Sequence, residues 1–358
     1  MDRETALREL SAGNPDLQRL AARVLGRWAD DEVLDALVGA LQSPHRGIRD
    51  AATDTLIEIG DARTVKRLLP LLKSNLPAVR NSARSLLQRL SKAAPELLVD
   101  LAHDPDVRMR IFAANIMAES GDHELAVPLL DLLDDPDENV RDAAVVGLGR
   151  LGAPEAVVRL EEIASSGASW TRFSAIDALG EIRAPEALRA LLRIVADASP
   201  ELQEPALEAL GRQRATESVL PLIQLLHTAP ALGPVVASVL AALPAVEVAR
   251  RVPGADRPVL AQVLSERLRQ NGLAPAAAAA FLDLLGELGE AVDAAVFLRP
   301  LASTQRSVQR AAVRAAGRLR LSETIPLLRQ LKSQGDPALS GEIQEALSRF
   351  GEPGKERS

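Results

Sequence analysis

Apolar positions recur with helical spacing along most of the chain. An aliphatic residue is followed by Arg or Gln, which we call the anchor, then by Ala three residues after the anchor and by Leu four residues later. The phrase returns about every 31 residues. Apolar residues at this spacing mark one face of a helix and are not typical of a strand. Because one such unit cannot bury its own apolar face, the pattern predicts a solenoid of stacked repeats.

Three columns of residues define the repeat. The anchors are Gln18, Arg49, Arg80, Arg110, Arg141, Arg172, Gln203 and Gln309, with Ser340 at the last equivalent position. The alanines are Ala21, Ala52, Ala83, Ala113, Ala144, Ala175, Ala206 and Ala312. The Leu column is Leu25, Leu56, Leu87, Met117, Leu148, Leu179 and Leu210. We expect helices to approach one another at the alanines and the Leu column to fill their shared core.

Each repeat divides into two helices. The stretch ENVRDAAVVGLGRLG predicts one helix, and Pro154 begins a second, because proline is tolerated in a first helical turn. Turns that combine Pro with Asp, Asn or Ser join one repeat to the next. The sequence therefore predicts an all-α fold, an α-α superhelix of about 11 stacked helical pairs.

The phrase DPDENVRDAAVVGLGRLG, with weaker copies in SPHRGIRDAATDTLIEIG and LPAVRNSARSLLQRL, resembles the HEAT repeats, in particular the short bacterial class similar to phycobilin-lyase-type repeats. The resemblance implies a HEAT-repeat solenoid. It also implies that the anchor arginines reach the acidic turns of neighbouring repeats, which contain Asp104, Asp106, Asp135 and Asp137. Because this class includes many scaffolds and a few enzymes, the resemblance says little about function.

The domain prediction is a single solenoid over residues 1–351, regular over 14–226 and 274–350, with a disordered tail at 352–358. Residues 227–273 are irregular, because the anchor at 203 and the aligned position 278 lie 75 residues apart, where two repeats take about 62. We expect one repeat enlarged by a short extra helix. It is either a divergent repeat with no special role or a bend between two sub-arrays.

Charge alternates in the column nine residues after each anchor. The column reads Arg27, Glu58, Arg89, Glu119, Arg150, Glu181 and Arg212, and after the irregular segment Glu287 and Arg318. Neighbouring repeats would place each charge between two opposite ones. We interpret the alternation as a device for register and solubility, with each exposed pair contributing roughly 0.2–1 kcal/mol.

Candidate binding residues stand one and five positions after the anchors, where the residue type varies between repeats. Trp170 and Phe173 would join apolar side chains of two preceding repeats in an apolar centre flanked by Asn and Asp, which is how protein interfaces concentrate their energy. The proposed residues are Ile111, Asn115, Asp142, Val146, Trp170, Phe173 and Asp177. In the alternative interpretation, Trp170 fills the irregular turn GASW against the next repeat.

A secondary candidate is a basic stripe near the C-terminus. Its members are Arg306, Arg310 and Arg314, followed four residues later by Arg318, so they share one helical face. One interpretation is a solvated face neutralised by Asp283, Glu287 and Glu345 on flanking repeats. The other is a docking surface for an acidic partner.

The sequence offers no catalytic, cofactor-binding or metal-binding residues that we would assign. The pair His123-Glu124 resembles one of the four His-Glu motifs of deoxyhypusine hydroxylase, but the other three are missing. The acidic run Asp134, Asp135, Asp137 and Glu138 could suggest calcium, but it matches a repeat turn and a helix N-cap. Without cysteine, the chain has no disulfide, thiolate metal site or Cys nucleophile.

Charge and hydropathy argue against nucleic acid and membranes as partners. A net charge of −7 argues against nucleic acid, which requires a basic stripe. The N-terminus lacks an apolar signal region and no run of about 18 apolar residues occurs, so we expect a cytoplasmic protein without membrane insertion. The predicted function is a non-catalytic scaffold or adaptor that holds another protein's helix or extended segment on its concave face. The alternative, from family resemblance alone, is a bilin lyase or related tetrapyrrole-handling subunit.

Overall fold

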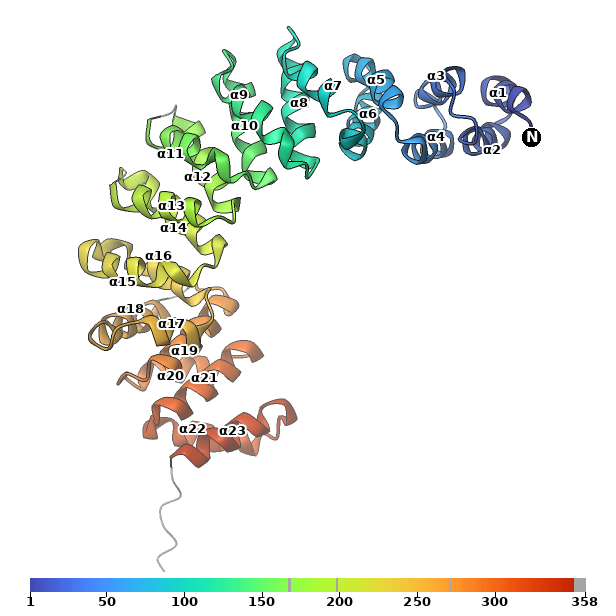
Figure 1. Cartoon of the computed structure of the whole chain (residues 1–358). Helices are drawn as coiled ribbons and strands as arrows, with labels where there is room; N and C mark the ends of the chain where they lie inside the picture. The colour runs from blue at the N-terminus through green and yellow to red at the C-terminus, as the bar shows by residue number, and fades with distance from the viewer. Residues whose placement is uncertain (167–168, 198, 271, 351–358) are drawn as a thin grey trace, which may run out of the picture. The chain divides into compact units, whose positions relative to one another are not determined.

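A computed structural model describes residues 1–166, 169–197, 199–270 and 272–350 of the chain (Figure 1). Within this part of the chain, the regular elements are 23 α-helices and nine short 3-10 helices, and no strand occurs. The all-α prediction is therefore confirmed. The chain divides into two compact units, Met1–Ala184 and Pro185–Ser358. The predicted tail at 352–358 lies outside the described residues.

The first unit consists of six helical pairs in chain order. Its helices are α1 (Arg3–Ala12), α2 (Pro15–Leu25), α3 (Asp31–Ala40), α4 (Arg46–Ile59), α5 (Ala62–Leu68), α6 (Pro77–Leu90), α7 (Pro95–Ala102), α8 (Val107–Glu119), α9 (Ala126–Asp131), α10 (Glu138–Leu151), α11 (Val157–Ser166) and α12 (Ser169–Glu181). The even-numbered helices carry the anchors and pack on one another in sequence, forming what we call the anchor layer. The odd-numbered helices form the second layer of this unit.

The second unit contains five further pairs and one additional helix. Its helices are α13 (Pro185–Asp197), α14 (Pro200–Gln213), α15 (Val219–Thr228), α16 (Gly233–Ala241), α17 (Ala245–Arg251), α18 (Arg257–Arg269), α19 (Pro275–Leu288), α20 (Ala295–Leu301), α21 (Arg306–Leu319), α22 (Ile325–Ser333) and α23 (Pro337–Arg349). Here α14, α16, α19, α21 and α23 form the anchor layer. The predicted number of about 11 pairs is confirmed.

Short 3-10 helices begin or extend many of the second-layer helices. They are η1 (Leu69–Lys73), η2 (Ser91–Ala93), η3 (His123–Leu125), η4 (Leu132–Asp134), η5 (Pro154–Ala156), η6 (Thr216–Ser218), η7 (Pro230–Leu232), η8 (Gly254–Asp256) and η9 (Ser322–Thr324). Pro154 does begin the element that follows α10, but its first turn is the 3-10 helix η5 and the α-helix starts at Val157.

The Ala and Leu columns are buried as predicted. Every alanine of the column is fully buried, and the Leu column, including Met117, is at most 1% exposed. At about 25 cal/mol per Å² of apolar surface, a fully buried Leu side chain contributes roughly 1.5–3 kcal/mol. Stacking therefore supplies the core that a single repeat lacks.

The anchors cap the end of the helix that precedes them. The Nη1 atoms of Arg49, Arg80 and Arg141 donate to the carbonyls of Ser43 (2.8 Å), Ser74 (2.7 Å) and Asp135 (2.7 Å) in the turns just upstream. The three glutamine anchors use their Nε2 atoms to reach carbonyls eight residues upstream, at Leu10, Val195 and Leu301. These carbonyls lie at the C-terminal ends of helices, which leave acceptors unpaired. The anchors are therefore structural.

Arg110 shows the bond that the family resemblance implied. Its Nε and Nη2 atoms donate to the Asp135 carboxylate in the next repeat's turn at 2.7 and 2.9 Å, and its Nη1 donates to the Asp104 carbonyl at 3.0 Å. The expectation of a carboxylate partner is thus confirmed at Arg110. Across the column, however, the common partner is a backbone carbonyl at the end of the preceding helix or in the turn after it, which either Gln or Arg can reach.

Glycine allows the anchor-layer helices to approach closely at one further column. A Cβ placed on Gly149 of α10 would lie 2.6 Å from the Cα of Ala178 in α12. A Cβ on Gly317 of α21 would lie 2.7 Å from the Cα of Ala346 in α23. Because real Cβ atoms do not approach backbone this closely, these repeats require glycine eight residues after the anchor.

The alternating charge column forms ion pairs between neighbouring repeats in both units. In the first unit, Arg150 Nη1 lies 3.6 Å from Glu119 Oε1. In the second, Arg318 pairs with Glu287. These two contacts show the pairing that the alternation predicts, and the role of the column in register and solubility stays a prediction.

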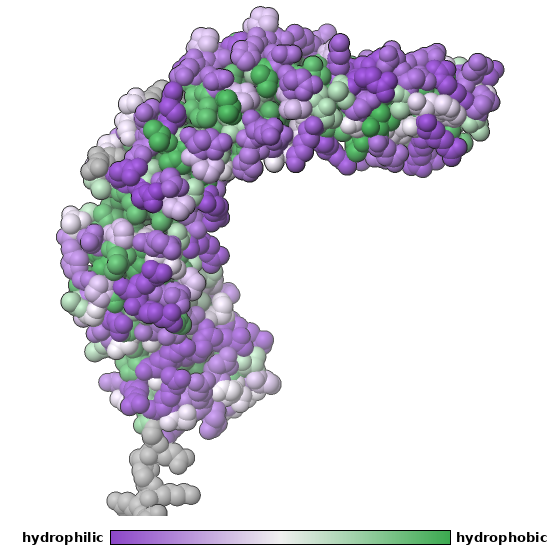
Figure 2. Space-filling view, viewed as in Figure 1, coloured by the Kyte–Doolittle hydropathy of each residue, from purple (hydrophilic) through white to green (hydrophobic). Residues whose placement is uncertain are grey.

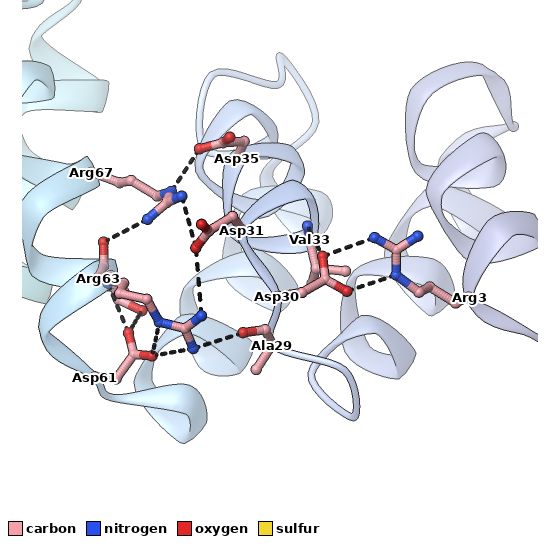
Figure 3. A network of polar contacts seen from close by, with 10 residues as sticks. Arg3, Ala29, Asp30, Asp31, Val33, Asp35, Asp61, Arg63 and Arg67 are labelled. Carbon is pink, nitrogen blue, oxygen red and sulfur yellow. Dashed lines mark hydrogen bonds and ion pairs between the residues drawn. The ribbon is translucent and has the colours of Figure 1, made fainter.

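A second set of ion pairs, which the sequence did not predict, connects second-layer helices of the first unit (Figure 3). Arg3 of α1 reaches Asp30 at the start of α3 at 2.7 Å, and Arg67 of α5 reaches Asp31 of α3 at 3.1 Å. Arg63 of α5 donates to the Ala29 carbonyl at 2.9 Å. The hydrogen bonds from Arg3 and from the Val33 N–H lower the pKa of Asp30 to about 2. Helix α3 thus offers carboxylates to arginines on both sides.

The irregular segment keeps the repeat register through α16. Val236 and Leu240 of this helix are buried where other repeats have the Ala and Leu columns, which places Gly233 at the anchor position, 30 residues after Gln203. The extra length comes afterwards, as the seven-residue helix α17, which packs on α19. The short extra helix predicted in this segment is therefore α17.

Arg257 caps two helix ends in the enlarged repeat. Its Nη2 donates to the Ala249 carbonyl at the end of α17 at 2.9 Å, and its Nη1 reaches the Leu288 carbonyl at the end of α19 at 3.4 Å. A single guanidinium thus closes two helix ends around the enlarged repeat.

Candidate functional site

The predicted binding residues lie on three successive anchor-layer helices of the first unit. Helix α8 carries Ile111 and Asn115, α10 carries Asp142 and Val146, and α12 carries the remaining three. Together with Glu138 at the start of α10, we call this set the Trp170 surface. Its members are Ile111, Asn115, Glu138, Asp142, Val146, Trp170, Phe173 and Asp177.

Two aromatic side chains of α12 remain exposed. Trp170 is 43% exposed and Phe173 is 40% exposed, whereas Phe281 and Phe297 in the second unit are fully buried. Neither Trp170 nor Phe173 therefore belongs to the core. The alternative, in which Trp170 fills the turn GASW, rests partly on residues 167–168, which lie outside the described part of the chain.

Trp170 is held from the preceding repeat. Its indole Nε1–H donates a hydrogen bond to a carboxylate oxygen of Glu138. This bond could not be predicted from the sequence, because an acidic residue such as Glu138 is common in the first turn of a helix, where the helix dipole favours it. The bond orients the indole while leaving two-fifths of the side chain open to solvent.

Asp142 is a partly buried carboxylate of the Trp170 surface, and one of its oxygens has no hydrogen-bond partner. Its Oδ1 atom is shielded from solvent and has no hydrogen-bond partner, although the Ser174 hydroxyl of α12 bonds to the carboxyl group. Burial raises the pKa of Asp142 against the hydrogen bond from Ser174, and the nearby Glu138 carboxylate adds to the rise. A partly buried carboxylate without full compensation destabilises the folded chain.

Replacing Asp142 by Asn should therefore stabilise the protein at neutral pH. A carboxyl group whose pKa is raised by folding favours the folded state only while protonated, below its unfolded pKa of about 4, and this contribution is lost as pH rises through the folded pKa. We expect Asp142→Asn to raise the free energy of unfolding by up to about 1 kcal/mol at pH 7, because the group is partly solvated. The gain should shrink toward pH 4 in thermal unfolding followed by circular dichroism; a gain independent of pH would contradict this account.

The other members provide partly exposed apolar and polar groups. Ile111 and Val146 are half-buried, and Asp177 is exposed. The Asn115 Nδ2 donates to the Ile111 carbonyl of its own helix at 2.9 Å, so this amide already has a hydrogen-bond acceptor within α8. The structure thus combines aromatic, aliphatic and acidic groups on neighbouring helices.

The basic stripe of the second unit is paired with carboxylates. Arg310 Nε lies 3.0 Å from Glu342, Arg314 Nη2 lies 2.8 Å from Asp283, and Arg306 Nη2 lies 3.7 Å from Asp336. The predicted partners Asp283 and Glu287 do pair with the stripe, but Glu345 instead pairs with Arg349. The visible surface over α19–α23 is largely hydrophilic (Figure 2). These contacts favour the neutralised face over a docking site.

A hollow in the second unit accompanies the enlarged repeat. It has a volume of about 650 Å³ and is lined by residues of α14, α16 and the end of α18, among them Glu204, Glu208, Val239 and Arg267. Carboxylates and a guanidinium are mixed on its walls. The sequence marked this segment as irregular, but residue spacing alone does not show a hollow.

The acidic turn before α10 has structural roles. Asp137 caps the helix by accepting from the N–H groups of Asn139 and Val140, and Asp135 accepts from the Asp137 N–H and pairs with Arg110. Among the described residues, no group of three or more His, Cys, Asp or Glu side chains is placed to hold a metal ion. Within the same part of the chain, none of the helices combines the length and apolar character that a membrane crossing requires.

The repeat geometry agrees with the comparison of the sequence with protein families. The family model for HEAT repeats matches residues 4–88, 94–179 and 160–244, and the chain belongs to this family. The bilin biosynthesis protein PecE of Mastigocladus laminosus is 32% identical over 111 residues, which span 30% of this chain. The match covers 41% of the length of PecE.

Solved structures with a similar fold include the karyopherin Kap121p and importin beta. The chain is similar to Kap121p, with a TM-score of 0.58 and 16% identity over 97% of this chain and 45% of that one. It is also similar to importin beta, with a TM-score of 0.54 and 15% identity over 97% of this chain and 57% of that one. At such identities the likeness concerns the fold alone.

Proposed function

We propose that this protein is a non-catalytic scaffold or adaptor and that its Trp170 surface binds a helix or extended segment of another protein. The observation that carries the proposal is the exposure of Trp170 and Phe173, two bulky aromatic side chains of the anchor-layer helix α12, whereas Phe281 of the anchor-layer helix α19 is fully buried.

The chemistry of the surface supports this proposal. Aromatic side chains concentrate binding energy at protein interfaces because they bury a large area at low entropic cost. The indole is held by Glu138, so less ordering remains to be done when a partner binds. Kap121p, which shares the fold, has been solved bound to Pho4p.

The proposal is tested by affinity capture from an extract of the source organism with three tagged forms of the protein. We expect Trp170→Ala to bind the proteins that the wild type retains with about 30-fold lower affinity, because a hot-spot residue contributes about 2 kcal/mol or more. Val158→Ala is the matched control, because Val158 is 66% exposed on α11, in the second layer. Circular dichroism should show that both variants are folded. Equal retention by Trp170→Ala and wild type would contradict the proposal.

A second candidate is suggested by the match to PecE. A bilin-handling protein would retain a linear tetrapyrrole, so the purified chain mixed with biliverdin should become coloured and keep its colour through gel filtration. A colourless protein fraction after gel filtration would count against this function. The scaffold proposal predicts that colourless result.

A further inference from the structure

The Trp170 surface is acidic. Three of its eight members, Glu138, Asp142 and Asp177, carry carboxylates, and none carries a positive charge. The nearest arginines of α10 are committed elsewhere: Arg141 donates to the carbonyls of the turn before its helix, and Arg150 pairs with Glu119. The charges of Glu138 and Asp142 are therefore not neutralised by arginines of the same helix.

Two of these carboxylates, those of Glu138 and Asp142, lie on the same side of α10. Glu138 and Asp142 lie four residues apart on α10, on the same side of the helix, where like charges repel. Burial raises the pKa of Asp142, and the Glu138 charge adds to the rise. Asp142 Oδ1 also lacks a hydrogen-bond donor. The free protein thus holds a like-charge pair that a cation would relieve.

The two carboxylates are flanked by the exposed aromatic side chains. Glu138 bonds the Trp170 indole, and Asp142 bonds Ser174, the residue that follows Phe173. Arginine and lysine suit this combination, because each has a charged head for carboxylates and an apolar stem for aromatic surface. Cations also favour the faces of aromatic rings.

We propose that the Trp170 surface selects a partner segment that presents an arginine or lysine next to an apolar side chain, with the cation paired to Glu138 and close enough to Asp142 to offset its charge. This inference rests on the protein-binding function proposed above and adds the chemical class of the partner. The apolar neighbour packs on Phe173, Ile111 and Val146. An acidic segment would be repelled, and a purely apolar one would leave the like-charge pair unrelieved.

The test uses a phage-displayed library of random 12-residue peptides, selected on the immobilised full chain. We expect the selected peptides to be enriched in arginine or lysine beside apolar residues. A representative peptide should bind the double variant Glu138→Gln, Asp142→Asn about tenfold or more weakly than wild type, with a smaller dependence on salt. Both substitutions keep side-chain acceptors, and Asp142→Asn should not lower stability, so weaker binding would not reflect unfolding. Val158→Ala should leave the affinity unchanged.

The outcomes separate the two proposals. Peptides that depend on Trp170 but carry no excess of basic residues, or bind the double variant as tightly as wild type, would overturn the inference about charge and leave the binding function standing. Peptides that bind Trp170→Ala as tightly as wild type, or a selection that enriches none, would contradict the binding surface itself.

Discussion

Replacing Gly149 by leucine is expected to destabilise the first unit by about 3 kcal/mol or more. A Cβ at this position would lie 2.6 Å from the Cα and 2.8 Å from the Cβ of Ala178, so α10 and α12 would have to move apart. The obstacle is backbone, which cannot be moved aside as a flexible side chain can. Even Gly149→Ala should cost about 1–3 kcal/mol. Urea-induced unfolding followed by circular dichroism measures both variants.

Gly39→Ala is the matched control for this prediction. Gly39 lies within α3, and a Cβ there would meet nothing within 4 Å. Because alanine is the better helix former, Gly39→Ala should be neutral or stabilising by up to about 1 kcal/mol. If the two Gly→Ala variants had the same stability, close helix approach at Gly149 would not be a requirement of the fold.

Removing the Arg110 side chain is expected to cost about 3–5 kcal/mol, the usual consequence of leaving a buried charge without its partner. The side chains of Arg110 and Asp135 are only 13% and 6% exposed, and their ion pair is 2.7 Å long. Burial opposes the ionisation of Asp135, but the bonds from Arg110 and the Asp137 N–H outweigh it and lower its pKa. Thermal unfolding of Arg110→Ala at neutral pH should show the loss.

Two further measurements sharpen this prediction. Arg108→Ala removes an arginine that is 75% exposed in the same helix, and it should change stability by less than about 1 kcal/mol. A carboxylate with a lowered pKa stabilises the fold above its unfolded pKa of about 4, and this contribution is lost as pH falls through the folded pKa. The difference between wild type and Arg110→Ala should therefore shrink in acid. An Arg110→Ala protein of undiminished stability would mean that the anchor column is not structural.

The helical pairs could be predicted from the sequence because burial repeats with the chain. Stacked repeats place equivalent residues in equivalent environments, so the Ala and Leu columns report the core directly. The sequence predicted only part of the capping role of the anchors. Arg110 reaches the carboxylate that the family pattern implied, but Gln18 and Arg49 bond backbone carbonyls, which no residue pattern displays.

The register of the irregular segment could not be predicted from the residue pattern either. Gly233 occupies an anchor position without a side chain, and the next capping arginine, Arg257, bonds the end of the inserted helix α17. The sequence showed that the phrase was interrupted but not that α16 still keeps its place in the stack. Only the burial of Val236 and Leu240 reveals this.

The sequence indicated most residues of the candidate surface, but not the bonds between them. Trp170 and Phe173 could be separated from the core because they fall outside the buried columns, and both are exposed. The bond between Trp170 and Glu138 joins residues 32 positions apart, and the orphaned Asp142 oxygen depends on side-chain packing. Neither follows from spacing. Both decide the charge and order of the surface, and so the kind of partner that we propose.

The central claim is that a partner protein lies on the Trp170 surface, and site-specific photo-cross-linking tests it most directly. Phe173 is replaced by p-benzoylphenylalanine in one form of the protein and Val158 in another, and both are irradiated in an extract of the source organism. The account predicts a discrete cross-linked protein from position 173 and none from position 158 of the second layer. A partner cross-linked at position 158 and absent at position 173 would contradict it.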